Sequence, residues 1–248
     1  MLLQDKVAVI YGAGGAIGGA VAQAFADEGA RVFRTGRAPA QDAAVVDALD
    51  EQAVERHLQS VIDEAGRVDI SFNAIGLPDS EITGGPLVEI DAERFARPVA
   101  AYTTSYFLTA RLAARHMLRQ GSGVIMTVTA LPARSGTRLN GGYGAAVAGK
   151  EALTRDLSAE LAPHGIRVVG LRPHGLPETA TMREVYAAKA DALGITWEQF
   201  EAYLAGTTHP RRVMTLDDVG GVAAFMASDR ASGMTGTTVN LTMGALDD

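Results

Sequence analysis

Short apolar runs alternate with amphipathic helical patterns along almost the whole chain. Most neighbouring runs are separated by a helical pattern, and strands that alternate with helices in this way are typical of a parallel sheet. The sequence therefore predicts an α/β fold with seven parallel strands. The strand-like runs are residues 7–11, 31–35, 43–47, 68–72, 124–129, 167–171 and 237–241.

Local signals place the ends of the main helices. A first helix is expected over residues 16–28, with Gly29 as its left-handed stop, and a second from the N-cap Asp50 to near Gly66. Two long helices are predicted over residues 92–119 and 143–162. Pro98 marks either a kink or the true start of the first of them.

Two segments depart from the alternation. Only nine residues lie between Arg37 and Asp47, too few for a crossover helix, so this connection is expected to be a loop. Residues 174–210 do not follow the alternation of strands and helices. They contain two short helical patterns, 180–193 and 196–205, which are expected to end at Gly194 and Gly206. Such an excursion indicates a substrate lid on a single domain spanning residues 1–248.

Composition narrows the function classes. The 248 residues are 47% hydrophobic and carry a formal net charge of −7 without a basic patch, so nucleic acid is not an expected partner. The absence of cysteine excludes disulfides and thiolate metal sites and is compatible with the cytoplasm. The five histidines have no metal-ligand spacing, so no metal is expected.

Residues 7–26 contain no charge and could be read as a membrane helix. Five glycines, at positions 12, 14, 15, 18 and 19, interrupt this stretch. They favour a strand, a tight turn and a helix instead, and no membrane partner is expected.

The glycine-rich turn after the first strand is the main candidate for cofactor binding. Gly12 permits a tight turn, Gly14 and Gly15 let phosphate oxygens approach the backbone, and Gly18 lets the helix lie close to the sheet. The amide groups and dipole of the following helix suit a pyrophosphate. A purely structural turn is the competing interpretation.

This turn resembles the Gly-x-x-x-Gly-x-Gly motif of short-chain dehydrogenases/reductases, with Ala16 where the middle glycine is usual, followed by Ile17 and Gly18. Asn73-Ala74-Ile75-Gly76 is similar to the family's Asn-Asn-Ala-Gly, with the second asparagine lost. The resemblance covers nearly the whole chain. It implies a Rossmann-type, doubly wound, NAD(P)-binding domain and a homotetramer packed through the two long helices and the last strand.

Arg37 favours NADP over NAD. It ends the second strand, where an acid would accept from the ribose of NAD and a guanidinium would hold the 2′-phosphate of NADP. Arg34 is a second candidate, and a solvated surface arginine is the alternative. The resemblance further places Asp47 and Ala48 at the adenine, Pro173, His174 and Gly175 in the family's Pro-Gly turn, and Thr179 at the nicotinamide.

The catalytic half of the family's site is only partly present. Tyr143 aligns with the catalytic tyrosine, because residues 151–161 match the family's helix without a gap. In this register Val147 stands at the lysine position, Ala130 at the serine position and Tyr102 at the asparagine position. Thr129 is the substitute for the serine that a one-residue bulge could bring to a substrate oxygen.

Lys150 is a poor substitute for the missing lysine. Seven residues bring it to nearly the face of Tyr143, but roughly 10 Å farther along the helix axis. We expect a lysine at an interface or helix flank, paired with a nearby carboxylate.

The missing partners have a measurable consequence. A tyrosine with a pKa near 10 is ionised in about one molecule in a thousand at pH 7, which opposes its use as a base by roughly 4 kcal/mol. Donating a proton needs the neutral phenol and suffers less. The resemblance thus implies a slow NADP-dependent oxidoreductase biased toward reduction of an unknown carbonyl.

Two alternative functions stay open. One is a cofactor-binding sensor or partner subunit with little turnover. The other is halohydrin dehalogenase-like chemistry, against which Val147 argues, because that chemistry has an arginine at this position.

Overall fold

The structure is a computed structural model that describes residues 1–39, 42–78, 82–179, 182–184, 187, 190 and 194–247. Its seven strands form one sheet in the order β3-β2-β1-β4-β5-β6-β7, and each neighbouring pair is parallel. From β1 the chain adds β2 and β3 on one side and then β4 to β7 on the other side, so the switch point lies between β1 and β4, as in doubly wound folds. The predicted fold class is confirmed. The strands are β1 Val7–Tyr11, β2 Arg31–Gly36, β3 Ala43–Val45, β4 Ile70–Asn73, β5 Gly123–Val128, β6 Ile166–Pro173 and β7 Thr237–Leu241.

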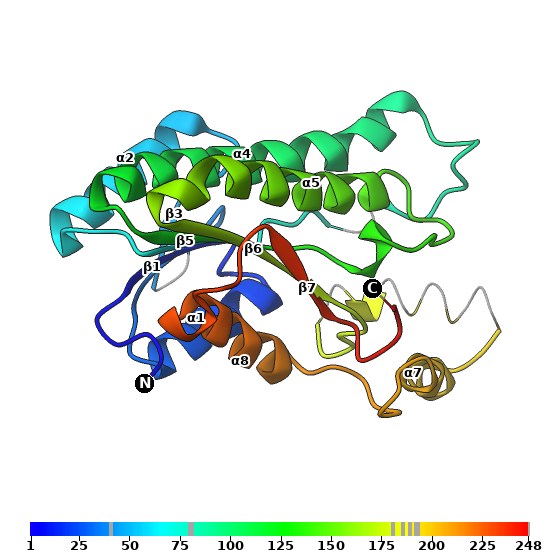
Figure 1. Ribbon diagram of the computed structural model, residues 1–248. Helices are drawn as coiled ribbons and strands as arrows, with labels where there is room; N and C mark the ends of the chain where they lie inside the picture. The colour runs from blue at the N-terminus through cyan, green and yellow to red at the C-terminus, as the bar shows by residue number, and fades with distance from the viewer. Residues whose placement is uncertain are drawn as a thin grey trace.

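Helices cover both faces of this sheet (Figure 1). On one face α2, α4 and α5 lie side by side, and on the other α1 packs along α8. The α-helices are α1 Ala16–Asp27, α2 Glu51–Ala65, α4 Ala92–Gln120, α5 Tyr143–Leu161, α7 Trp197–Gly206 and α8 Leu216–Ala227.

The two hydrophobic cores follow from the alternation of side chains along each strand. In β1, Ala8 and Ile10 point into the core beneath α1 and α8, whereas Val7 and Val9 point into the core beneath α2 and α4. Because both faces of a parallel sheet are covered, the central strands read as continuous apolar runs rather than alternating ones. This burial fixes the sheet's register and with it the position of the loops at the carboxyl ends of the strands.

Helix ends follow the predicted signals closely. The Asp50 carboxylate accepts hydrogen bonds from the backbone of Gln52 and Ala53, and Gly66 ends α2 with a φ of 77°. Gly29 has a φ of 91°, as a left-handed stop requires. Pro98 lies inside α4, which begins six residues earlier after the N-cap Asp91, so the expectation that it marks the true start is wrong.

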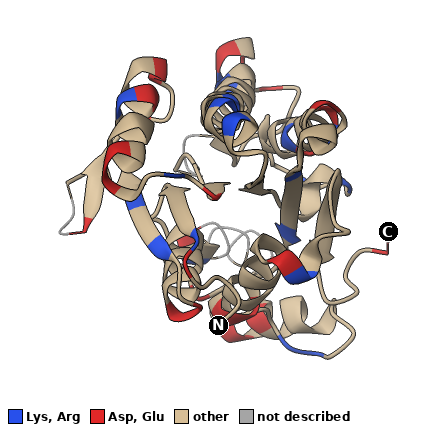
Figure 2. Cartoon of the chain, turned by 60° about the vertical axis from the view of Figure 1, so that its left-hand side comes forward, with Lys and Arg blue, Asp and Glu red and all other residues tan. Residues whose placement is uncertain are grey.

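The membrane interpretation of residues 7–26 is also wrong, because this stretch forms β1, a turn and most of α1. Within the described part of the chain, none of the helices combines the length and apolar character needed to cross a bilayer. Acidic and basic residues occur on the same helices (Figure 2). They also pair between helices, as Arg111 of α4 does with Glu51 of α2.

The excursion at residues 174–210 contains α7, which the second helical pattern predicted. Thr196 caps it, accepting a hydrogen bond from the backbone of Gln199 while the Gln199 side chain reaches back to Thr196. Gly206 is the last residue of α7 rather than a stop beyond it. The first helical pattern, 180–193, falls largely outside the described residues.

Candidate active site

The glycine-rich turn is built by close backbone packing. Gly12 has a φ of 82°, and a Cβ there would lie 2.7 Å from the carbonyl oxygen of Ala74. A Cβ on Gly18 would collide with the carbonyl of Gly12. Both positions therefore require glycine, which lets the start of α1 and the end of β4 approach the turn.

The outer side of this turn is open, as a cofactor phosphate would need. Gly14, Gly15 and Ala16 are exposed, and nothing lies within 4 Å of a Cβ built on Gly14. The N-cap of α1 is Gly15, which provides no side chain to accept from the first amide groups, and the first turn contains no acidic residue. The residues present therefore fit an anion held by the amides and dipole of α1.

The predicted adenosine contacts surround the same edge of the sheet. Ala74 and Ile75 are half-buried and Gly76 is exposed, directly after β4. Asp47 is exposed and accepts a hydrogen bond from the backbone of Leu49 at 2.9 Å, whereas Ala48 is buried. Arg37 is exposed just beyond the end of β2.

Two predicted cofactor residues have structural contacts of their own. Asn73 is buried, and its amide donates to the hydroxyl of Thr109 in α4 at 3.2 Å. The Thr179 hydroxyl donates to the carbonyl of Leu176 and accepts from the amide of Met182. Thr179 thus closes the turn that follows the end of β6, where Gly175 has a φ of 67°.

Tyr143 lies at the start of α5 beside Tyr102, the residue predicted to stand at the family's asparagine position. The rings of Tyr143 and Tyr102 meet edge to face, with centroids 5.9 Å apart and an interplanar angle of 83°. The Tyr102 hydroxyl accepts a hydrogen bond from the backbone of Leu77, just beyond the Asn73–Gly76 turn, at 3.1 Å. One tyrosine is therefore held against another at the carboxyl end of the sheet.

Val147, predicted to stand at the family's lysine position, is an apolar core residue of α5. It is 2% exposed and packs in a small apolar cluster with Ile82, Ala101, Tyr102 and Ala146. Ala130, at the serine position, follows β5 and precedes a short 3-10 helix, Leu131–Ala133. Neither residue brings a polar group to Tyr143.

Lys150 is buried in the centre of the fold, and the expectation of a flank lysine paired with a carboxylate is wrong. It is 1% exposed, and its ammonium donates to the Asn73 amide oxygen at 3.2 Å and to the Val128 carbonyl at 2.9 Å. The same nitrogen lies 5.9 Å from the ring centroid of Tyr102 and 5.7 Å from that of Tyr106. Burial lowers the pKa of Lys150 from 10.5 to about 7.

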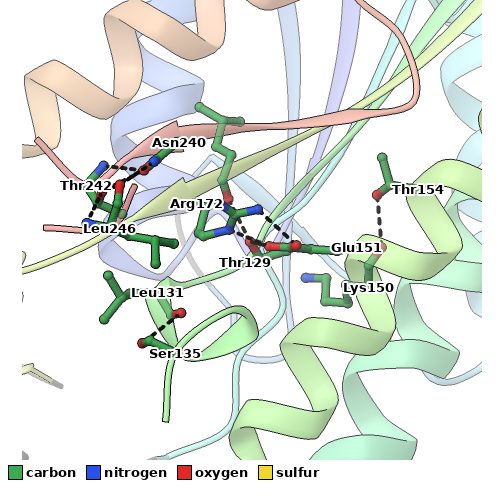
Figure 3. A network of polar contacts seen from close by, with 11 residues as sticks. Thr129, Leu131, Ser135, Lys150, Glu151, Thr154, Arg172, Asn240, Thr242 and Leu246 are labelled. Atoms are coloured by element: carbon green, nitrogen blue, oxygen red, sulfur yellow. Dashed lines mark hydrogen bonds and ion pairs between the residues drawn. The ribbon is translucent and has the colours of Figure 1, made fainter. Parts of the chain in front are cut away.

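A second polar network lies between α5 and β6 (Figure 3). The guanidinium of Arg172 binds both oxygens of Glu151, at 2.7 and 3.0 Å, with both side chains buried. The Thr129 hydroxyl lies 3.1 Å from a Glu151 oxygen and 3.2 Å from the Leu171 carbonyl. This places the hydroxyl of Thr129 in an internal network, and a contact with substrate remains a prediction.

The sequence interpretation missed both buried charged groups. Arg172 precedes Pro173 at the end of β6, directly after a buried apolar run, and Lys150 and Glu151 stand together in the middle of α5. A charged residue among residues that are expected to be buried is the sequence signal that could have identified them, because a buried charge must find a partner inside the protein. The sequence does not say which partners, because these come from β4, β5 and α4.

Comparison with known proteins agrees with this fold. A family model described as enoyl-(acyl carrier protein) reductase matches residues 12–245. An uncharacterized oxidoreductase, YxbG of Bacillus subtilis, is 32% identical over 96% of this chain and 89% of its own. Sorbitol-6-phosphate 2-dehydrogenase of Escherichia coli is 29% identical, covering 97% and 98% of the two chains.

Solved structures give the same result. The crystal structure of sorbitol-6-phosphate 2-dehydrogenase SrlD from Erwinia amylovora superposes with a TM-score of 0.89 at 28% identity, over 97% of this chain and all of that one. A parallel sheet with a glycine-rich first turn and a tyrosine at the start of α5 defines a dinucleotide-binding oxidoreductase fold. The chain belongs to the short-chain dehydrogenase/reductase family.

Proposed function

We propose that this protein is an NADP-dependent oxidoreductase that reduces a small carbonyl compound slowly, with Tyr143 as the proton donor. The observation that carries the proposal is the open glycine turn combined with Tyr143 at the start of α5. The relatives named as sorbitol-6-phosphate dehydrogenases support a substrate from the polyol and sugar class.

The cofactor preference rests on Arg37. Its exposed guanidinium stands at the end of β2, beside the turn that suits the pyrophosphate. A forked cation at this position matches a 2′-phosphate by charge and by hydrogen-bond geometry. The proposed cofactor contacts are Gly12, Gly14, Gly15, Ala16, Ile17, Gly18, Arg37, Asp47, Ala48, Asn73, Ala74, Ile75, Gly76, Tyr143, Pro173, Gly175 and Thr179.

When held at the glycine turn, a nicotinamide cofactor would provide hydride chemistry for the carbonyl carbon of the substrate. Tyr143 donates its phenolic proton to the carbonyl oxygen, which becomes a hydroxyl. The phenol is the abundant form of tyrosine at neutral pH, so reduction starts from the populated state, whereas oxidation needs the rare phenolate. Residues 174–210 are proposed to close over the substrate and limit access of water.

A second candidate function is cofactor binding with little turnover, as a sensor or a partner subunit. The specific observation in its favour is the apolar packing of Val147 against Tyr102, which leaves no cation at the family's lysine position. The two functions differ in hydride transfer but not in cofactor affinity.

Single-turnover hydride transfer separates these two functions. Enzyme and NADPH are mixed with aldoses, ketoses and simple ketones, and NADPH absorbance is followed in the stopped-flow instrument. A reductase consumes one equivalent of NADPH with at least one carbonyl. A pure binding protein consumes none, while its NADPH fluorescence titration still saturates.

We further propose that the protein assembles as a homotetramer in the cytoplasm. A shallow surface groove between α4 and α5 supports such an interface and includes Phe107, which is 40% exposed. An exposed aromatic residue beside small ones, such as Gly149 and Ala152, suits close packing of a second copy. Analytical ultracentrifugation would test this, with Phe107→Asp expected to give smaller species.

A further inference from the structure

The buried ammonium of Lys150 lies closer to the proposed active site than its spacing along α5 indicates. Its side chain runs inward from α5 to the ends of β4 and β5, where it meets Asn73 and Val128. These residues border the turn that carries the predicted cofactor contacts. Lys150 is therefore anchored to the wall of the site and not to the protein surface.

Four groups hold the ammonium in this position. Two are oxygen acceptors, the Asn73 amide and the Val128 carbonyl, and two are the rings of Tyr102 and Tyr106. Carbonyl dipoles and aromatic faces favour a cation over a neutral amine. They offset part of the desolvation that lowers the pKa of Lys150 to about 7. The positive charge is therefore available at and below neutral pH.

Tyr102 connects this cation to Tyr143. One ring is shared by both contacts: the Lys150 ammonium lies 5.9 Å from the centroid of Tyr102, and Tyr143 meets the same ring edge to face at 5.9 Å. The Tyr102 hydroxyl accepts from the Leu77 amide, which anchors the ring that contacts both residues. The ring of Tyr102 thus contacts both the ammonium of Lys150 and the phenol ring of Tyr143.

Within the part of the chain that the structure describes, the contacts of the Lys150 ammonium named above are with uncharged side chains and one backbone carbonyl. On α4 the titratable groups facing it are the phenols of Tyr102 and Tyr106, and burial raises the pKa of Tyr106. On α5, Glu151 is neutralised by Arg172 of β6 and hydrogen-bonded to Thr129 of β5. From β4 and β5 themselves the contacting groups are the neutral amide and carbonyl already named.

We propose that Lys150 is a positioning residue that supplies, through the ring of Tyr102, the positive charge that a lysine at position 147 would have given to Tyr143. As Tyr143 transfers its proton, negative charge develops on its oxygen, and a cation at about 10 Å in a medium of effective dielectric constant near 20 stabilises that charge enough for about tenfold in rate. The proton goes to the substrate oxygen, and Tyr143 is later reprotonated from water.

This inference rests on the proposed reductase function for its kinetic consequence, but the electrostatic coupling is testable without cofactor or substrate. The protein is labelled with tyrosine carrying ¹³C at Cζ, and the resonances of Tyr102 and Tyr143 are assigned with Tyr102→Phe and Tyr143→Phe. Between about pH 6 and pH 8.5, both resonances should shift with one shared midpoint near neutrality, at which Lys150 titrates. In Lys150→Met, which keeps the chain length and removes the charge, both shifts should disappear.

Thr154→Val is the matched control, because Thr154 hydrogen-bonds to the Lys150 backbone and to Tyr106 but carries no charge. It should leave both shifts in place. A Tyr143 resonance that ignores the titration, or that shifts equally in Lys150→Met, would overturn the proposal. If Lys150→Met does not fold, Lys150→Gln provides the same loss of charge with a polar group for Asn73 and Val128.

The kinetic arm uses single-turnover hydride transfer over the same pH range. The rate should be about tenfold higher below the midpoint than above it, and Lys150→Met should be slow at every pH. The double variant Lys150→Met with Val147→Lys should regain the higher rate. The midpoint of its rate–pH profile should lie at a higher pH than that of the wild type. Absence of hydride transfer in all variants, with the NMR coupling present, would refute the reductase function and leave the coupling intact.

Discussion

Tyr102 and Tyr143 stand edge to face with their ring centroids 5.9 Å apart. In the family register Tyr102 takes the place of an asparagine, so an aromatic ring occupies a position where an amide is usual. The ring also covers the ammonium of Lys150. Tyr102 therefore contacts Val147, Lys150 and Tyr143, which are all residues of α5.

Stability should rise with pH because of Lys150. Its pKa is lowered from 10.5 to about 7, so between these values the unfolded chain binds a proton that the folded protein does not. Unfolding free energy then increases by up to about 1.4 kcal/mol per pH unit over that window, and below about pH 7 the full cost of burying the charge opposes folding. Urea denaturation of wild type and Lys150→Met at about pH 6.5, 8 and 9 measures this.

The difference between these two proteins isolates Lys150 from other titrating groups. In Lys150→Met, the part of the pH dependence of the unfolding free energy that comes from Lys150 should be absent. The stability of the variant relative to the wild type should therefore be highest at the lowest pH. Parallel curves for the two proteins would mean that Lys150 keeps an ordinary pKa.

The ion pair between Glu151 and Arg172 should be a large local contributor to folding. Glu151→Gln keeps the size of the side chain but removes the negative charge from a buried ion pair, which costs about 3–5 kcal/mol. Chemical denaturation gives this number directly. Glu160→Gln, on the exposed side of the same helix, is the matched control and should change stability by less than about 0.5 kcal/mol.

Two glycines in the first turn should separate folding from cofactor binding. Gly18→Ala places a methyl group against the Gly12 carbonyl and should lower stability by about 1–3 kcal/mol. Gly14→Ala meets open space and should leave the melting temperature unchanged, while its methyl weakens NADPH binding where phosphate oxygens approach the backbone. Thermal denaturation and NADPH fluorescence titration of both variants decide this. Unchanged NADPH affinity in Gly14→Ala would move the pyrophosphate away from this turn.

Arg37 should set the choice between the two nicotinamide cofactors. Arg37→Ala should weaken NADPH binding by about 10- to 100-fold and leave NADH nearly unaffected, because only NADPH carries the 2′-phosphate. Arg34→Ala is the comparison, since Arg34 lies within the same strand and contacts Gln23 at 3.4 Å. Isothermal titration of both cofactors tests the prediction. An equal loss for NADH and NADPH would contradict the NADP assignment.

Periodicity and turn chemistry were sufficient to predict the sheet and most helix boundaries. The glycines at 29 and 66 and the aspartate at 50 act locally, so their effects can be read from the neighbouring residues alone. Pro98 was one of the two candidate starts of the long helix, but α4 begins at Ala92. A proline can be accommodated inside a helix when burial holds the helix together, as it does for α4.

The site was harder to predict than the fold, for a physical reason. The helical spacing from Tyr143 to Lys150 gave the separation along one axis, but a lysine side chain spans several ångströms and can turn inward toward β4 and β5. The acceptors that receive it come from segments 22 and 77 residues away in the chain. Contacts of this kind follow from the packing of the sheet and carry no local sequence signal.

Hydride transfer in a single turnover tests the central claim most directly. Wild type, Tyr143→Phe and the double variant Val147→Lys with Ala130→Ser are each mixed with NADPH and the carbonyl panel. We expect slow NADPH oxidation by wild type, a rate at least about a hundredfold lower in Tyr143→Phe, and a faster rate in the double variant. If neither the wild type nor the double variant oxidises NADPH while both bind it, the protein is not a reductase. If Tyr143→Phe matches wild type, Tyr143 is not the proton donor.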